Sequence, residues 1–169
     1  LWVNPDGSGK KKTRSNSRQL RAIAGKLLIR NPAGLLLGLE NVGTGISFML
    51  PILAGLTYKD FLYVEQPELH LHPKSQCEIA DVFIDAQSRG VTSIVETHSE
   101  HFILRLLRRI RETSRKKRQS KKTGLKGRDL LIYFFNPKED GSTSIHAIRV
   151  DDDGELLDPW PGGFFPERE

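Results

Sequence analysis

Two short stretches with the pattern of buried strands, each followed directly by polar residues, constrain the fold of this chain most. Phe61–Val64 leads into Glu65–Pro73, and Thr92–Glu96 leads into Thr97-His98-Ser99. Short runs of β-branched, aromatic and aliphatic residues are typical of strands buried in a parallel sheet. Open α/β sheets collect their functional groups at the carboxyl ends of such strands. The sequence therefore predicts an α/β fold with a site where these two strands end.

Further elements are expected around the two strands. Pro73 suits the first turn of a helix from Lys74 to about Gln87, which Gly90 ends. The order strand, helix, strand, helix, strand implies a parallel sheet with helices packed on its faces. The other expected elements are a helix capped by Ser47 and running to Leu56, an amphipathic helix from Ser99 to about Glu112, and strands over Leu130–Phe135 and Ser144–Val150. Asn31-Pro32 should interrupt the apolar runs Leu27–Ile29 and Leu35–Leu37.

The composition indicates a cytoplasmic globular protein. The 169 residues contain 37% hydrophobic and 28% charged residues, and no apolar run approaches the roughly 20 residues that span a bilayer. The single cysteine, Cys77, excludes an intramolecular disulfide, fits a reducing compartment and is interpreted as a packing residue of its helix. Because the sequence starts with Leu1 and has no signal-peptide pattern, we expect it to be cut from a longer protein.

The net charge of +5 comes from one segment. Residues 108–128 hold eleven Lys or Arg and a single acid, Glu112. This stretch, like the Lys10–Arg21 region, is interpreted as a loop or a frayed helix end that is simply solvated. The alternative is a patch that follows a phosphate backbone, for which the candidate residues are Arg115, Lys116, Lys117, Arg118, Lys121 and Lys122.

The polar residues after the two strands suit phosphate chemistry. Acids and amides at the end of an apolar strand can hold Mg²⁺, usually through water, and can orient an attacking water. A histidine just past the neighbouring strand can reach a terminal phosphate. Two other interpretations stay open: a solvated loop pair for Glu65 and Glu68, and a zinc site built from His70, His72, Glu96, His98 and His101.

At this point the residues resemble a known family. Glu65-Gln66-Pro67-Glu68-Leu69-His70-Leu71-His72-Pro73 after an apolar strand resembles the Walker B motif and D-loop of ABC-type ATPases of the SMC, RecF and OLD group, within the AAA family. Thr97-His98-Ser99 resembles their switch, and Asn41–Ser47 resembles a divergent signature motif. Asp153-Gly154-Glu155 and Trp160–Phe165 resemble the C-terminal extension of one bacterial branch.

The resemblance implies roles for single residues. Glu65 would stand at the Mg²⁺-associated Walker B acid, and Gln66 at the catalytic Glu of most members. An amide cannot act as a general base, so slow hydrolysis, or use of Glu68 or Glu96 instead, follows. His98 would contact the γ-phosphate. Gly43, Gly45 and Ser47 would approach the nucleotide of a second subunit, although Phe48 stands where a polar residue is common.

The resemblance also implies a domain plan. It consists of a linker over 1–25, an ABC-type P-loop NTPase lobe over 26–136 that includes the basic insertion 108–128, and a small β-rich extension over 137–169. The lobe would be incomplete on its N-terminal side, because no stretch of this sequence has the glycine and lysine spacing of a Walker A loop. Gly7-Ser8-Gly9-Lys10 lacks the second glycine and a preceding strand, and is interpreted as linker.

The expected function is ATP binding and Mg²⁺-dependent hydrolysis in a longer protein that dimerises around ATP. The family resemblance suggests service in DNA transactions or antiphage defence, with possible DNA and a nuclease or other effector as partners and no membrane. The alternative is a non-hydrolysing ATP-gated clamp, in which Gln66 marks lost catalysis.

Overall fold

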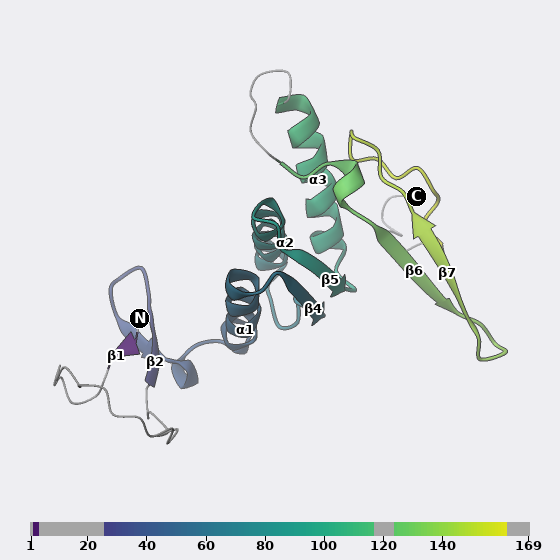
Figure 1. Ribbon diagram of the computed structural model, residues 1–169. Helices are drawn as coiled ribbons and strands as arrows, with labels where there is room; N and C mark the ends of the chain where they lie inside the picture. The colour runs from purple at the N-terminus through teal and green to yellow at the C-terminus, as the bar shows by residue number, and fades with distance from the viewer. Residues whose placement is uncertain (1, 4–25, 117–123, 162–169) are drawn as a thin grey trace, which may run out of the picture. The chain divides into compact units, whose positions relative to one another are not determined.

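The computed structural model describes residues 2–3, 26–116 and 124–161, which fall into two compact units divided after Ser47 (Figure 1). The first unit contains the antiparallel sheet β1-β2-β3, formed by β1 (Trp2–Val3), β2 (Lys26–Arg30) and β3 (Leu36–Gly38). The expected break at Asn31-Pro32 is confirmed as the turn between β2 and β3. There the Asn31 side chain accepts a hydrogen bond from the Leu35 amide at 2.9 Å.

Helix α1 (Thr44–Tyr58) begins earlier than predicted. It follows the short 3-10 helix η1 (Leu39–Asn41), and the division between the units falls within it. Ser47 lies inside the first turn of α1, so the prediction that Ser47 caps this helix is wrong. The turn that begins the helix lies upstream of Ser47, where the Ile46 amide donates a hydrogen bond to the Gly43 carbonyl at 3.0 Å.

The centre of the second unit is the predicted pair of parallel strands. Strands β4 (Phe61–Glu65) and β5 (Thr92–Glu96) pair in register, from Phe61 opposite Thr92 to Glu65 opposite Glu96. Helix α2 (Pro73–Ser88) makes the crossover between them, with His72 at its N-cap and Pro73 in its first turn. The strand–helix–strand unit predicted from the sequence is confirmed.

One face of this two-stranded sheet packs against helices. Leu62, Val64 and Val95 point toward a core that also holds Leu56 of α1, Ile79 and Phe83 of α2, and Phe102 of α3 (Glu100–Lys116). Phe83 and Phe102 meet edge to face, with ring centroids 5.7 Å apart. The hydrophobic core therefore lies on the side of the even-numbered β4 residues.

The opposite face of the same sheet is open over the described residues. Phe61 is 55% exposed, and Tyr63 and Ile94 are each 54% exposed. The expectation that helices cover both faces of a parallel sheet is thus met on one face only. Residues directly opposite each other in a ladder share a face, so Phe61, Tyr63 and Glu65 lie on this open face with Thr92, Ile94 and Glu96.

The expectation of a third parallel strand is wrong. Strands β6 (Ile132–Pro137) and β7 (Thr143–Ile148) pair antiparallel with each other. Their connection is a short turn in which the Lys138 amide donates to the Ser142 carbonyl at 2.8 Å. A connection this short can join only antiparallel neighbours, because a parallel return needs a longer crossover.

The C-terminal segment docks on α3 through apolar contacts and one glycine. Ile103 and Leu107 of α3 form a second cluster, packed against side chains that come largely from the segment after α3. Gly154 has φ +72, and a Cβ at this position would collide with the Leu107 carbonyl oxygen. Close backbone approach therefore requires glycine here. Arg111 supports the same contact through a hydrogen bond to the Asp153 carbonyl at 3.1 Å.

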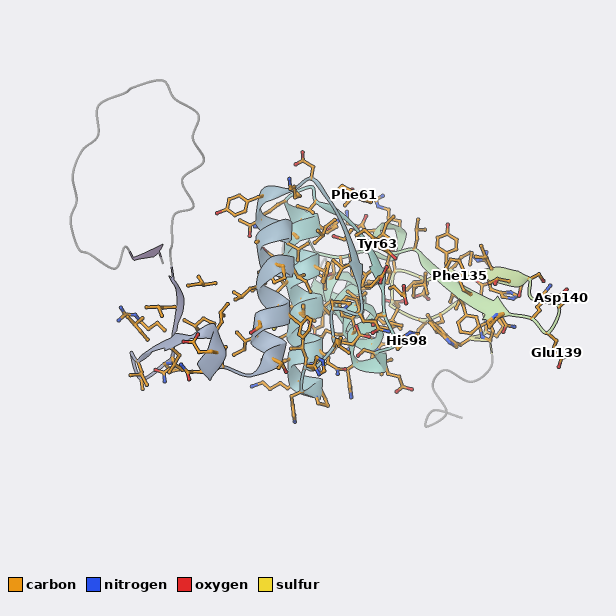
Figure 2. All side chains as sticks on the ribbon, turned by 90° about the horizontal axis from the view of Figure 1, so that it is seen from below. Phe61, Tyr63, His98, Phe135, Glu139 and Asp140 are labelled. Atoms are coloured by element: carbon orange, nitrogen blue, oxygen red, sulfur yellow. The ribbon has the colours of Figure 1, made fainter. Side chains whose placement is uncertain are left out.

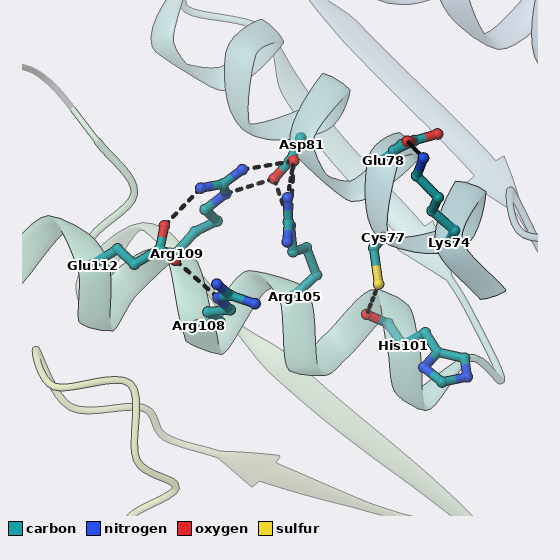
Figure 3. Close-up of polar contacts among 9 residues, drawn as sticks. All are labelled: Lys74, Cys77, Glu78, Asp81, His101, Arg105, Arg108, Arg109 and Glu112. Atoms are coloured by element: carbon teal, nitrogen blue, oxygen red, sulfur yellow. Dashed lines mark hydrogen bonds and ion pairs between the residues drawn. The ribbon is translucent and has the colours of Figure 1, made fainter.

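The first part of the basic segment is regular helix. Helix α3 continues to Lys116, beyond the predicted end near Glu112. Figure 3 shows the guanidinium groups of Arg105 and Arg109 on the carboxylate of Asp81 in α2. Arg108 and Arg109 also pair with Glu112, at 2.8 and 2.6 Å. Arg105 and Arg109 thus link α3 to α2, and Arg108 and Arg109 form ion pairs within α3. This part of the basic segment is therefore a packed helix and not a loop.

Candidate functional site

The backbone leaves β4 through a sharp, strained turn. The Gln66 amide still donates to the Glu96 carbonyl of β5, at 2.8 Å. Gln66 then adopts φ +46, and His70 adopts φ +61. Side chains with a Cβ rarely occupy this left-handed region, and each such residue costs on the order of 1–3 kcal/mol. The predicted Walker B segment is therefore held in a specific, unfavourable backbone shape.

Glu68 is buried between these two strained residues. It is only 9% exposed. Its Oε1 accepts a hydrogen bond from the His98 backbone amide at 2.8 Å, and its Oε2 has no hydrogen-bond partner among the residues that the structure describes. A buried carboxylate therefore links the loop after β4 to the loop after β5.

The loop after β5 is fixed by the start of α3. Ser99 is buried, and its hydroxyl accepts a hydrogen bond from the Phe102 amide at 3.0 Å, as a helix N-cap does. The same hydroxyl donates to Gln76 Oε1 of α2 at 2.6 Å. The His98 backbone is thus fixed on one side by the hydrogen bond to the buried Glu68 and on the other by the capped start of α3.

Three polar side chains gather at the carboxyl end of the open sheet face. Glu65 and Glu96 are direct partners in the β4–β5 ladder, and Nε2 of His98 lies 4.0 Å from Oε1 of Glu96. The imidazole is mainly solvent-accessible, with 72% of the side chain exposed. Figure 2 labels His98 together with Phe61 and Tyr63 of the neighbouring strand. The structure therefore brings together three residues that the sequence placed at the ends of separate strands.

Tyr63 completes the open face beside the acids. Its hydroxyl donates to Glu65 Oε1 at 2.9 Å. This hydrogen bond raises the pKa of Tyr63, and the negative charges of Glu65 and Glu96 act in the same direction. Nothing in the local sequence signals this contact, because alternation along the strand reveals only that Tyr63 and Glu65 share a face.

The histidines do not form the alternative zinc site. In residues 2–3, 26–116 and 124–161, no group of three or more His, Cys, Asp and Glu side chains could hold a metal ion. His72 Nδ1 accepts from the Lys74 amide at 3.3 Å as the cap of α2, while His70 packs on the Phe48 ring, with centroids 5.3 Å apart. The proposed cluster of His70, His72, Glu96, His98 and His101 is therefore wrong, because helix capping and ring packing separate its members.

The remaining candidate residues belong to the first unit, to the end of α3 or to segments outside the described residues. Gly43 precedes α1, and Gly45 and Ser47 lie in its first turn, within the first unit. Arg115 is exposed near the end of α3. Lys116 is the last residue of that helix, and Lys117, Arg118, Lys121 and Lys122 lie outside the described residues, as do most of the predicted linker 1–25 and residues 162–165.

Glu65, the residue predicted to hold Mg²⁺, has an exposed carboxylate but belongs to no group of three or more candidate metal ligands among the described residues. The exposed Glu65 carboxylate at the end of β4 supplies oxygen ligands, which Mg²⁺ prefers, and exposure leaves room for the waters that Mg²⁺ retains. The Cys77 thiol lies between α2 and α3, where it contacts the His101 carbonyl at 3.7 Å. No helix of the described residues is long and apolar enough to cross a membrane.

Two families of known proteins match parts of the chain. Residues 8–103, more than half of the chain, match a family described as AAA ATPase domain. Residues 125–169 match a second family, described as a protein of unknown function (DUF3696). No curated protein matches the chain, and neither does any solved structure.

The first match covers both parallel strands and the His98 loop. It implies the P-loop NTPase fold, and it points to ATP binding and hydrolysis with ATP and Mg²⁺ as the typical requirements of the family. The chain belongs to the AAA ATPase domain family.

Proposed function

We propose that this chain supplies the Walker B strand and the switch histidine of an ABC-type ATPase. The observation that carries the proposal is the grouping of Glu65, Glu96 and His98 at the carboxyl end of one open sheet face. Because these 169 residues contain no Walker A loop, the phosphate-binding loop comes from another segment or subunit. That partner segment would cover the open face beside Phe61 and Tyr63, since parallel sheets are normally buried on both faces.

Each residue then has a role that its position allows. Glu65 would hold Mg²⁺ through water, and the bound ion would supply positive charge that offsets the charge of the phosphates. The exposed imidazole of His98 contacts the γ-phosphate, and Glu68 keeps the His98 backbone in place by accepting its amide hydrogen. Gln66, at the strained end of β4, can orient a water but cannot accept its proton.

The resemblance to ABC-type ATPases further implies a dimer that closes around ATP. Two copies would enclose ATP, with Gly43, Gly45 and Ser47 of one copy facing the nucleotide of the other. Closure would follow from contacts to the γ-phosphate that only the closed pair makes, and hydrolysis would release them. We further propose service in DNA transactions or antiphage defence, with DNA or a nuclease as partner.

The proposal is tested by ATP hydrolysis in the natural full-length protein. We expect Mg²⁺-dependent turnover that His98→Ala lowers by about 10²–10³-fold, since His98 would stabilise transition-state charge. His101→Ala is the matched control, because the His101 ring lies on the exposed surface of α3, and it should retain the parent rate.

The other outcomes point to other functions. Binding of ATP without turnover would favour the ATP-gated clamp, in which Gln66 marks lost catalysis. Failure to bind ATP at all would exclude the ATPase proposal.

A further inference from the structure

We infer that Glu96 is the general base of the proposed ATPase, in the place of the glutamate that Gln66 replaces. The inference rests on the proposed function and adds a catalytic residue to it. Four polar side chains belong to the ends of β4 and β5 and the loop after β4: Glu65, Gln66, Glu68 and Glu96.

Gln66 cannot activate the attacking water by itself. Its amide carries no lone pair basic enough to take a proton at neutral pH, so at most it positions the water. Its backbone amide donates to the Glu96 carbonyl at 2.8 Å, and this bond holds the backbone of Gln66, just past β4, against the end of β5. Glu96 therefore belongs to the same end of the sheet as the position that lacks its acid.

Glu68 and Glu65 are already engaged. Glu68 is buried, and it accepts the His98 amide at 2.8 Å, so its carboxylate serves the backbone of the switch loop. Glu65 accepts the Tyr63 hydroxyl at 2.9 Å and is assigned to the magnesium ion. The other oxygen of Glu68, Oε2, has no partner among the described residues but is buried away from solvent, and Glu65 has the magnesium role, which leaves Glu96 as the exposed acid beside His98.

Glu96 has the exposure and the neighbours that a base requires. Its side chain is 52% exposed, and its Oε1 lies 4.0 Å from Nε2 of His98. It lies directly opposite Glu65 in the ladder, on the same open face. The Glu96 carboxylate is thus next to both the magnesium-binding residue and the group that contacts the γ-phosphate, which is where the attacking water must be held.

The step conserves atoms and charge. A water oxygen attacks the γ-phosphorus of ATP, and a new P–O bond forms. The bond from the γ-phosphorus to the bridging oxygen breaks, and ADP leaves with its electron pair. One proton of the water passes to the Glu96 carboxylate and then to solvent, so the products are ADP, inorganic phosphate and a proton.

The test separates the chemical step from binding in the natural full-length protein. Glu96→Gln preserves the shape of the side chain and removes only its basicity. We expect kcat to fall by about 10²–10⁴-fold, while the affinity for the β,γ-imido analogue of ATP with Mg²⁺ changes by less than about threefold. The matched control is Glu78→Gln, an identical change on an exposed face of α2, which should leave both quantities unchanged.

Each result has one meaning. A fall in kcat of at least tenfold with retained analogue binding supports Glu96 as the base. A smaller fall, or loss of analogue binding, overturns the inference, and if His98→Ala still abolishes turnover in that case, the proposed ATPase survives without it. Absence of turnover in the unmodified protein would overturn both.

Discussion

At the scale of single residues, Glu68 supports the candidate site through the backbone of a neighbouring loop. Its buried carboxylate accepts the His98 amide and so couples the ends of two strands. Hydrogen bonds to charged groups contribute about 1.5–3 kcal/mol, and an unpaired buried donor costs a similar amount. The geometry of the exposed His98 imidazole therefore depends on a residue that substrate need not touch.

Glu68→Ala should destabilise the protein by about 2–3 kcal/mol, because it removes the acceptor of the His98 amide and leaves a small cavity. Glu68→Gln retains an oxygen acceptor and should cost less than about 1 kcal/mol. The measurement is the urea midpoint at pH 7, together with hydrogen exchange at the His98 amide. Equal midpoints for the alanine and glutamine variants would show that this hydrogen bond contributes nothing.

At the scale of elements, the two faces of the parallel strands have opposite surroundings. Leu62, Val64 and Val95 pack on helices, while Phe61, Tyr63 and Ile94 are each more than half exposed. A substitution therefore removes core packing at one residue of a strand and only exposed apolar surface at the next. This difference offers an internal control within β5, because Ile94 and Val95 are neighbours.

Val95→Thr should cost about 1–3 kcal/mol, because it places a hydroxyl against the core. Ile94→Thr should change the free energy of unfolding by less than about 0.5 kcal/mol, as expected for a surface position. It should also reduce binding of a hydrophobic dye to the isolated chain. Thermal unfolding and dye fluorescence measure the two effects; a large loss of stability from Ile94→Thr would mean that another segment of this chain covers the open face.

At the scale of the whole second unit, the ion pairs between α2 and α3 make stability depend on pH. Asp81 accepts hydrogen bonds from Arg105 and Arg109 at 2.6–3.2 Å (Figure 3). Partial burial by itself raises the pKa of Asp81, but the hydrogen bonds from Arg109 and Arg105 outweigh it and hold this pKa well below its ordinary value. The ionised form is therefore the one that the fold stabilises.

Because the folded pKa of Asp81 is depressed, the stabilisation is present above the ordinary aspartate pKa and is lost as the pH falls below about 4. At pH 7, Asp81→Asn should cost about 1–3 kcal/mol, less than for a fully buried pair because the partners are partly exposed. Urea unfolding from pH 7 to pH 2.5 should show the difference from the parent shrinking below pH 4. Asp85→Asn, in an exposed pair with Arg89, should cost less than about 0.5 kcal/mol; a pH-independent difference for Asp81→Asn would contradict the assignment.

The sequence by itself determined the local elements and the end of the sheet at which the polar residues meet. The strands at Phe61 and Thr92, and the helix after Pro73, follow from short-range patterns of apolar residues and from proline preference. The ends of helices were less predictable, since Ser47 lies inside α1 and α3 continues to Lys116. Capping competes there with packing and with side-chain pairs that local patterns do not specify.

Only the tertiary structure decided which side chains work together. The opposition of Glu65 and Glu96, the burial of Glu68 under the His98 loop and the pairing of Asp81 with Arg105 each join residues more than twenty positions apart. Such contacts depend on strand register and on the approach of one helix to another. Composition and periodicity predict which face of each helix or strand is apolar or polar. Which other element contacts that face is decided by the packing of the folded chain.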